Sequence, residues 1–196
     1  MIRELFKPDK QKKKIFLVIG LIVFLFFVVF IYFFQKDIKR EIVDLPPIKT
    51  LGKIYTPENL RSMQYLDMYV MKGSTVINEV KPLLSSKEAK ERWMAIYVIG
   101  RVSQKTSAEI LVPFLQDEDE IVKIAAAGTL INKGYKQAIP VLIEGLGSTA
   151  FIEYLSPKRE IANFCLEVLG VYTKQSFINQ TDWQKWWDEN RETITI

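Results

Sequence analysis

The chain has 196 residues, 48% of them apolar, with 27 Lys and Arg against 23 Asp and Glu and no histidine. Residues 1–44 hold 9 of the basic and 5 of the acidic side chains, which leaves 18 of each for residues 45–196. A nucleic-acid-binding domain needs a concentrated basic face, so the neutrality of the larger part argues against that class. The single cysteine, Cys165, excludes an intrachain disulfide.

Residues 1–14 form a basic tail, and residues 15–34 are 20 consecutive residues without a charge. As a helix this run would extend about 30 Å, the thickness of the hydrocarbon core of a bilayer. A cleaved signal peptide is the alternative, but its apolar region is usually only about 7–15 residues long and is followed by a small-x-small site, which is missing here. The sequence therefore predicts a single transmembrane helix over residues 15–34.

The charges on either side of this run predict its orientation. Five lysines precede it, and three basic residues follow it, namely Lys36, Lys39 and Arg40. Because the more basic flank stays in the cytoplasm, we expect a cytoplasmic N-terminus and an extracytoplasmic remainder, either periplasmic or extracellular.

Residues 35–55 read as a juxtamembrane linker, since Pro46-Pro47 and Gly52 oppose helix formation. Thr56-Pro57-Glu58 then resembles a helix start, and apolar residues recur at helical spacing until Gly73. We expect residues 56–196 to form the folded domain.

An internal repeat with an offset of 31 residues organises this domain. Glu91–Gly100 aligns with Val122–Ile131, and Val80–Leu84 aligns with Leu111–Leu115, proline on proline. A fixed period of this size is typical of stacked helical hairpins that bury their apolar faces against each other. The hairpins are predicted over these pairs of ranges: 74–84 with 87–102, 107–116 with 119–133, and 137–146 with 157–172.

The third pair and the C-terminus depart from the repeat. Ile161 corresponds to Val122 at an offset of 39, so about eight extra residues separate the two helices of the third pair. Thr181-Asp182 are predicted to cap a short helix that carries Trp183, Trp186 and Trp187 on one face and covers the end of the array. No strand of consequence is predicted.

Motifs for catalysis are missing from the sequence. It contains no G-x-S-x-G elbow, phosphate-binding glycine loop or dinucleotide fingerprint, and Cys165 falls on an inward position where a small buried side chain is expected. The acidic run at residues 117–120 lies at a turn between helices, where acids cap the next helix. We therefore expect no enzyme activity, no cofactor, no metal and no small-molecule substrate.

The first helices containing Pro82 and Pro113, the acidic turn and the run Val122–Ile131 resemble HEAT repeats. The stretch Leu169–Phe177 followed by Asp182–Asn190 resembles the closing segment of bacterial HEAT-repeat proteins. The resemblance covers about residues 74–191 and implies an α-solenoid with a binding role. It also implies a ladder of Asp–Arg pairs between repeats. The usual arginine of this ladder is replaced by Lys123 in the second repeat and by Ala162 in the third. Some HEAT-like bacterial proteins are bilin lyases, but no lyase motif occurs here.

Two sets of side chains are candidates for binding a partner. In such arrays the second helices line the concave face, and residues 91, 94, 95, 98, 99 and 102 are predicted to face the core. Exposed aromatic and basic side chains on that face are typical of interfaces, and the first set is Trp93, Tyr97, Lys90 and Arg101. The alternative is that Trp93 and Tyr97 pack under the preceding helix. The second set lies in the insertion, whose apolar residues either fold back or meet a partner: Phe151, Ile152, Tyr154 and Leu155.

The sequence thus predicts an all-α protein, with one N-terminal transmembrane helix followed by a short α-solenoid of about three HEAT-like hairpins plus flanking helices. Its predicted function is a membrane-anchored scaffold that binds a protein partner, as a subunit or assembly factor of an envelope complex. The alternatives are a module that binds cell wall or lipid, and a lyase-like or maturation-factor HEAT protein.

Overall fold

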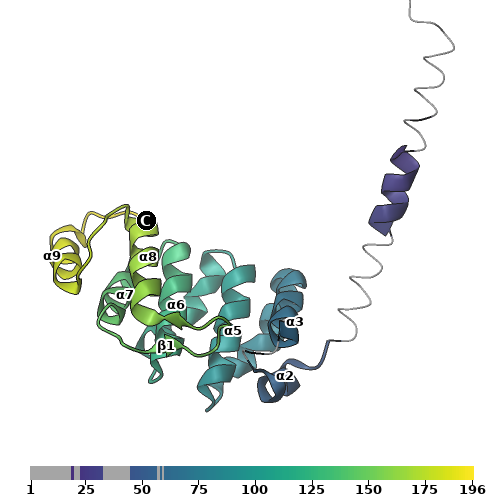
Figure 1. The fold of residues 1–196 in the computed structure, drawn as a ribbon, viewed down its shortest axis with the longest axis horizontal. Helices are drawn as coiled ribbons and strands as arrows, with labels where there is room; N and C mark the ends of the chain where they lie inside the picture. The colour runs from purple at the N-terminus through teal and green to yellow at the C-terminus, as the bar shows by residue number, and fades with distance from the viewer. Residues whose placement is uncertain (1–18, 20–22, 33–44, 57, 59) are drawn as a thin grey trace, which may run out of the picture. The chain divides into compact units, whose positions relative to one another are not determined.

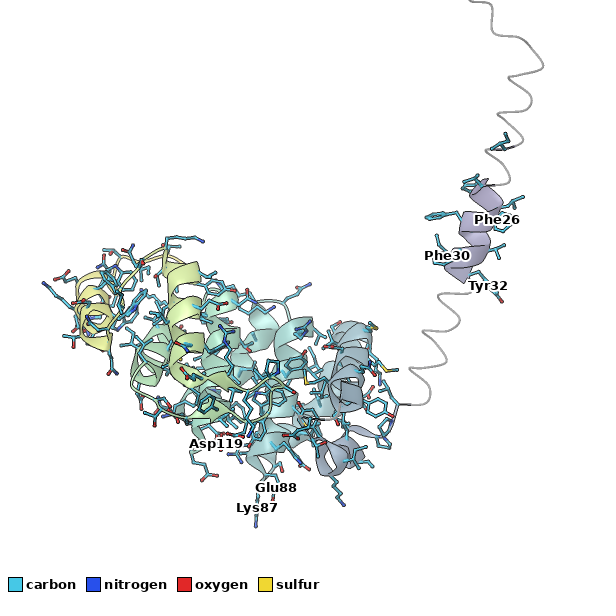
Figure 2. The ribbon with its side chains drawn as sticks, viewed as in Figure 1. Phe26, Phe30, Tyr32, Lys87, Glu88 and Asp119 are labelled. Carbon is cyan, nitrogen blue, oxygen red and sulfur yellow. The ribbon has the colours of Figure 1, made fainter. Side chains whose placement is uncertain are left out.

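The computed structural model describes residues 19, 23–32, 45–56, 58 and 60–196. These belong to two units, Met1–Leu45 and Pro46–Ile196 (Figure 1). In the first unit, residues 23–32 are helical and all ten side chains are exposed, among them Phe26, Phe30 and Tyr32 (Figure 2). Of the predicted span over residues 15–34, residues 15–18, 20–22 and 33–34 lie outside the described residues. Within the described ranges, no helix has the length and apolar character needed to cross a bilayer.

The second unit begins with helices α2 (Ile48–Ile54) and α3 (Leu60–Met71). Helix α2 corrects the expectation that residues 35–55 resist helix formation. Pro47 precedes its first turn, where a missing N–H costs nothing, and Leu51 is completely buried. Gly52 does not break the helix: a Cβ there would lie 2.5 Å from a carboxylate oxygen of Glu91. The glycine therefore lets α2 approach α5 closely.

The first helical hairpin consists of η1 (Gly73–Val76), α4 (Ile77–Val80), η2 (Lys81–Ser85) and α5 (Ala89–Val102). The second consists of η3 (Thr106–Gln116) and α6 (Glu120–Asn132). Both predicted hairpins are confirmed, but much of each first segment is 3₁₀ rather than α-helix. Pro82 and Pro113 lie inside these segments and lack the N–H that an α-helical ladder uses.

The third hairpin consists of η4 (Lys136–Ala138), α7 (Ile139–Gly145) and α8 (Ile161–Thr173). Between α7 and α8, strands β1 (Phe151–Ile152) and β2 (Arg159–Glu160) pair antiparallel, which the sequence did not predict. The Ile161 N–H also donates to the Ala150 carbonyl at 3.0 Å. These bonds close the insertion into a loop whose two ends lie together. Figure 1 shows that loop running from β1 back toward α5.

Helix α9 (Gln180–Asn190) closes the C-terminal end by packing against α7, as predicted. Its N-cap is Asn179, whose side chain accepts a hydrogen bond from the Asp182 N–H at 2.9 Å, so the predicted cap at Thr181-Asp182 is corrected. Trp183 is completely buried, and its indole N–H donates to the Phe177 carbonyl at 3.1 Å. The buried tryptophan therefore anchors α9 on the array.

Helix α5 is buried on more sides than the predicted inward stripe. Met94, Ala95, Val98 and Ile99 are buried as expected. The additional buried positions are Arg92, Trp93, Ile96 and Gly100. They are covered because α5 packs against α3 on one side and α6 on the other, as well as against its own first segment.

Ion pairs connect successive hairpins. Arg92 donates from Nε and Nη2 to the two carboxylate oxygens of Asp117, at 2.9 and 2.7 Å, with both side chains only 7% exposed. That hydrogen bond is the main reason why the pKa of Arg92 lies above its usual value. At the next junction Lys123 pairs with Glu144 at 3.3 Å in a more exposed position. Among the described residues, the ladder implied by the HEAT resemblance thus has its usual Arg–Asp form at the first junction, whereas a Lys–Glu pair stands at the second.

Helices α5 and α6 begin at the same edge of the unit. Their N-caps are Glu88 and Asp119, and Figure 2 shows both residues at the lower edge of the unit. Toward the other ends of the helices, a Cβ on Gly100 would lie 2.6 Å from the Thr129 side chain. The two helices therefore run side by side in the same direction, and their C-terminal ends lie together at the opposite edge.

Candidate functional site

A pocket of about 280 Å³ lies between the three second helices and the insertion. Helix α5 forms one wall, α6 the floor, and α8 together with the insertion the remaining sides. We refer to it as the groove. Its lining is mostly apolar and comprises Trp93, Ile96, Tyr97, Gly100, Arg101, Ile121, Ile124, Ala125, Gly128, Thr129, Asn132, Ile152, Leu155 and Phe164.

The α5 wall begins at an aromatic cluster around Trp93. The ring centroids of Tyr55, Tyr97 and Tyr154 lie 5.9, 5.5 and 5.4 Å from that of Trp93. Trp93 is only 4% exposed, because Tyr55 and Tyr154 cover it from the preceding segment and from the insertion. The expectation of a solvent-facing Trp93 is therefore wrong: it packs in a cluster and contributes an edge to the groove.

Tyr97 and Arg101 continue this wall one and two turns further on. The Tyr97 hydroxyl donates to a carboxylate oxygen of Asp67 on α3 at 2.8 Å, which confirms the alternative that Tyr97 packs under α3. Burial, followed by that hydrogen bond, raises the pKa of Tyr97 to about 12, so the phenol stays protonated at neutral pH. The Arg101 guanidinium lies 5.2 Å from the centre of the Tyr97 ring. This contact holds an exposed cation at the mouth of the groove.

Two helical glycines, Gly128 in the floor and Gly100 in the α5 wall, set how closely the helices of the groove approach one another. A Cβ on Gly128 would lie 2.8 Å from Cζ of Phe164, so the absence of a side chain lets the α8 ring lie directly against α6. Gly100 plays the same part for Thr129. Glycine inside a helix costs about 1 kcal/mol relative to alanine. Close approach of the neighbouring side chains offsets that cost here.

The insertion supplies the outer wall. Ile152 is 5% exposed and Leu155 is half-buried, and both line the groove. Tyr154 is fixed through its backbone: the Tyr55 hydroxyl, which also lies 2.9 Å from the Met63 sulfur, donates to the Tyr154 carbonyl at 2.7 Å. Lys158 and Glu153 form an ion pair across the loop. The apolar insertion residues have therefore mainly folded back.

The groove unites most of the two sets of predicted residues. Trp93, Tyr97 and Arg101 from the first set face Ile152 and Leu155 from the second. The other three do not line it. Lys90 donates to the Tyr55 carbonyl at 3.1 Å, Phe151 is 42% exposed on the β1 strand, and Tyr154 packs behind the wall on Trp93.

Sequence reasoning missed the α6 floor and Phe164 on α8. A usable signal was present, because the 31-residue offset carries Trp93, Tyr97 and Arg101 onto Ile124, Gly128 and Asn132. All three of these α6 residues line the groove. Applying the repeat to candidate site residues, as well as to core positions, would have found them.

The groove offers shape and one charge rather than reactive groups. Cys165 is completely buried against Gly145, and burial raises the pKa of its thiol to about 12, so it is not a thiolate at neutral pH. Within the part of the chain that the structure describes, no group of Asp, Glu or Cys is arranged to hold a metal ion. Asp119 and Asp117 instead accept hydrogen bonds from backbone N–H groups at the start of α6.

Residues 77–153 match the family model described as HEAT repeats, a range that begins at α4 and ends within the insertion. No curated protein matches the chain. The match supports a HEAT-repeat domain and agrees with the helical architecture. HEAT repeats commonly serve as protein-interaction scaffolds and are generally non-catalytic.

Proposed function

We propose that this protein is a scaffold that docks a protein partner in the groove, as a subunit or assembly factor of a membrane-bound envelope complex. The observation that carries the proposal is the groove itself, where three predicted binding residues on a second helix, α5, meet two predicted residues of the insertion. Apolar and aromatic side chains around an exposed arginine are the composition that interface hot spots favour. Binding therefore needs no chemistry beyond what these residues supply.

Membrane anchoring is the second part of the proposal. It is supported by the 20 uncharged residues at 15–34 and by the exposure of every apolar side chain from residue 23 to 32. Ten adjacent exposed apolar side chains are costly in water, whereas they are suited to lipid. The flanking lysines orient the anchor so that the HEAT-repeat unit lies outside the cytoplasm.

Affinity purification of the full-length tagged protein in mild detergent tests the docking site. We compare the wild type with Leu155→Arg, which puts a charge into the groove wall. The matched control is Ile178→Arg, the same kind of change at a position that is 90% exposed and does not line the groove. We expect stoichiometric partners with the wild type and Ile178→Arg and none with Leu155→Arg. Partners that Leu155→Arg retains would contradict docking in the groove, and recovery of the protein alone would favour a cell-wall or lipid ligand.

Cysteine labelling tests the anchor and its orientation. Because Cys165 is buried, the wild type should react little with a maleimide that cannot cross membranes. A cysteine at exposed position Gln184 should be labelled from outside intact cells, whereas one at position 8 should be labelled only after lysis. The reverse pattern would overturn the orientation, and release of the protein by an alkaline carbonate wash would overturn the anchor.

A further inference from the structure

The lining of the groove carries a single, positive charge. Among the residues that line it, all of them in the described part of the chain, Arg101 is the one with a charge. None of the ion pairs found between described residues involves Arg101, and its side chain is exposed. The nearby acid Asp67 is held by the Tyr97 hydroxyl and does not line the groove. An arginine placed over an aromatic ring without a carboxylate is ready to accept an anion.

The groove also has an apolar half and a polar half. Residues toward the N-terminal ends of α5 and α6 are apolar, namely Trp93, Ile96, Ile121 and Ile124, and the insertion adds the apolar Ile152 and Leu155. Toward the C-terminal ends lie the polar groups, namely Arg101, Thr129 and Asn132. Because the two helices run in the same direction, the halves do not alternate. A ligand that fits must itself have an apolar part and a polar, anionic part.

The α5 helix gives the distance between these parts. Trp93 and Arg101 are eight residues apart, which corresponds to roughly 12 Å along a helix. An extended peptide advances about 3.3 Å per residue, so three or four residues cover that distance. The groove volume of about 280 Å³ is just below the roughly 300–1,000 Å³ of ordinary small-molecule pockets, which suits one or two side chains of a larger partner.

On these grounds we infer that the partner presents an extended segment with a large apolar side chain and, three or four residues away, a carboxylate. The apolar side chain enters the half lined by Trp93, Ile124 and Leu155, and the carboxylate pairs with Arg101. This inference rests on the proposed docking function and specifies its ligand. The C-terminal ends of α5 and α6 carry partial negative charge, so Arg101 is needed to make an acid acceptable there.

A display library of random peptides, selected on the full-length chain in detergent, tests this chemistry. Peptides that also bind Leu155→Arg are discarded, so that only groove-dependent sequences remain. We expect these sequences to share an apolar residue and an Asp or Glu at a spacing of three or four. Synthetic peptides from the selection are then measured by fluorescence anisotropy against the wild type and Arg101→Glu.

The charge reversal should weaken binding roughly 10-fold or more, the size expected for loss of a charged hydrogen bond. Replacing the peptide acid by lysine should restore binding to Arg101→Glu, which separates charge pairing from damage to the fold. Groove-dependent peptides that lack an acid and bind Arg101→Glu unchanged would overturn this inference while leaving protein docking intact. If the selection yields no groove-dependent peptide and oleate binds stoichiometrically in the groove, both the peptide inference and the proposed protein docking would be overturned in favour of a lipid ligand.

Discussion

The two junctions between successive hairpins are built in different ways. At the first, the bidentate Arg92–Asp117 ion pair is buried, and α5 packs closely on α6 because Gly100 has no side chain. At the second, Lys123 takes the place of Arg92 and pairs with the exposed Glu144, and about eight additional residues separate the helices of the third hairpin. The insertion crosses this junction and packs Tyr154 against Trp93 of the first hairpin. The first junction is thus formed by the repeated helices themselves. The second is bridged by the irregular insertion, which also forms a wall of the groove.

The largest effect should follow from breaking the first junction. Arg92→Ala leaves the buried Asp117 carboxylate without its cation, and loss of one partner of a buried pair costs about 3–5 kcal/mol of unfolding free energy. Urea denaturation of the full-length chain in detergent, followed by tryptophan fluorescence, measures this. The matched change at the second junction is Lys123→Ala. Equal effects of the two variants would show that the junctions do not differ.

Removal of the hydroxyl that fastens the insertion should have the next largest effect. Tyr55→Phe keeps the ring in the aromatic cluster but removes the donor to the Tyr154 carbonyl. We expect a loss of about 1–2 kcal/mol, since a part-buried acceptor loses its hydrogen bond. Hydrogen exchange should rise in residues 151–160 before it rises in α5. Unchanged protection of the insertion would mean that side-chain packing alone holds it.

Gly128, in the groove floor, allows a test in which one substitution should destabilise the wild type but stabilise a variant. In the wild type, Gly128→Ala should destabilise by about 1 kcal/mol, because overpacking against Phe164 exceeds the gain in helix propensity. In a Phe164→Ala background the clash is absent, and the same change should stabilise by about 1 kcal/mol. Thermal unfolding of the four chains measures the coupling. Additive effects would show that Phe164 does not set the approach of α8.

The smallest effect is expected at the exposed pair of the second junction. Lys123→Ala should change the unfolding free energy by less than about 1 kcal/mol, the usual range for surface ion pairs. Repeating the measurement at high salt should reduce the difference further. A loss as large as that of Arg92→Ala would mean that the second junction depends on its ion pair after all.

Local pattern was sufficient for most of the fold. The 31-residue offset located the first two hairpins, Gly73 ends α3 with φ of 68° as a terminating glycine does, and the tryptophan helix covers the end as expected. Pro46-Pro47 led us to expect no helix where α2 forms, but a proline before the first turn is compatible with a helix. Packing of Gly52 on Glu91 favours that helix, and no local pattern reveals such a contact.

The candidate site was only half visible in the sequence. Periodicity marks Trp93, Tyr97 and Arg101 as lying off the core stripe, but it does not show that Tyr55 and Tyr154 cover Trp93. Tyr55 and Tyr154 are 99 residues apart and lie in segments without a repeat. The path of the insertion follows from contacts between distant residues, and these decide which apolar side chains become a wall of the groove and which, like Phe151, stay exposed.

The fastening of Tyr55 to the insertion has a mechanical consequence. The chain enters the second unit at Pro46, whose carbonyl accepts a hydrogen bond from the Tyr69 hydroxyl at 2.6 Å, and Tyr55 follows directly after α2. Tension on the N-terminal segment would load the Tyr69 bond first and the Tyr55–Tyr154 bond after it. Rupture of the second bond would free one wall of the groove while α5 and α6 stayed joined through Arg92 and Asp117. If a partner segment docks in the groove as proposed, pulling force would weaken its binding before it unfolds the helices.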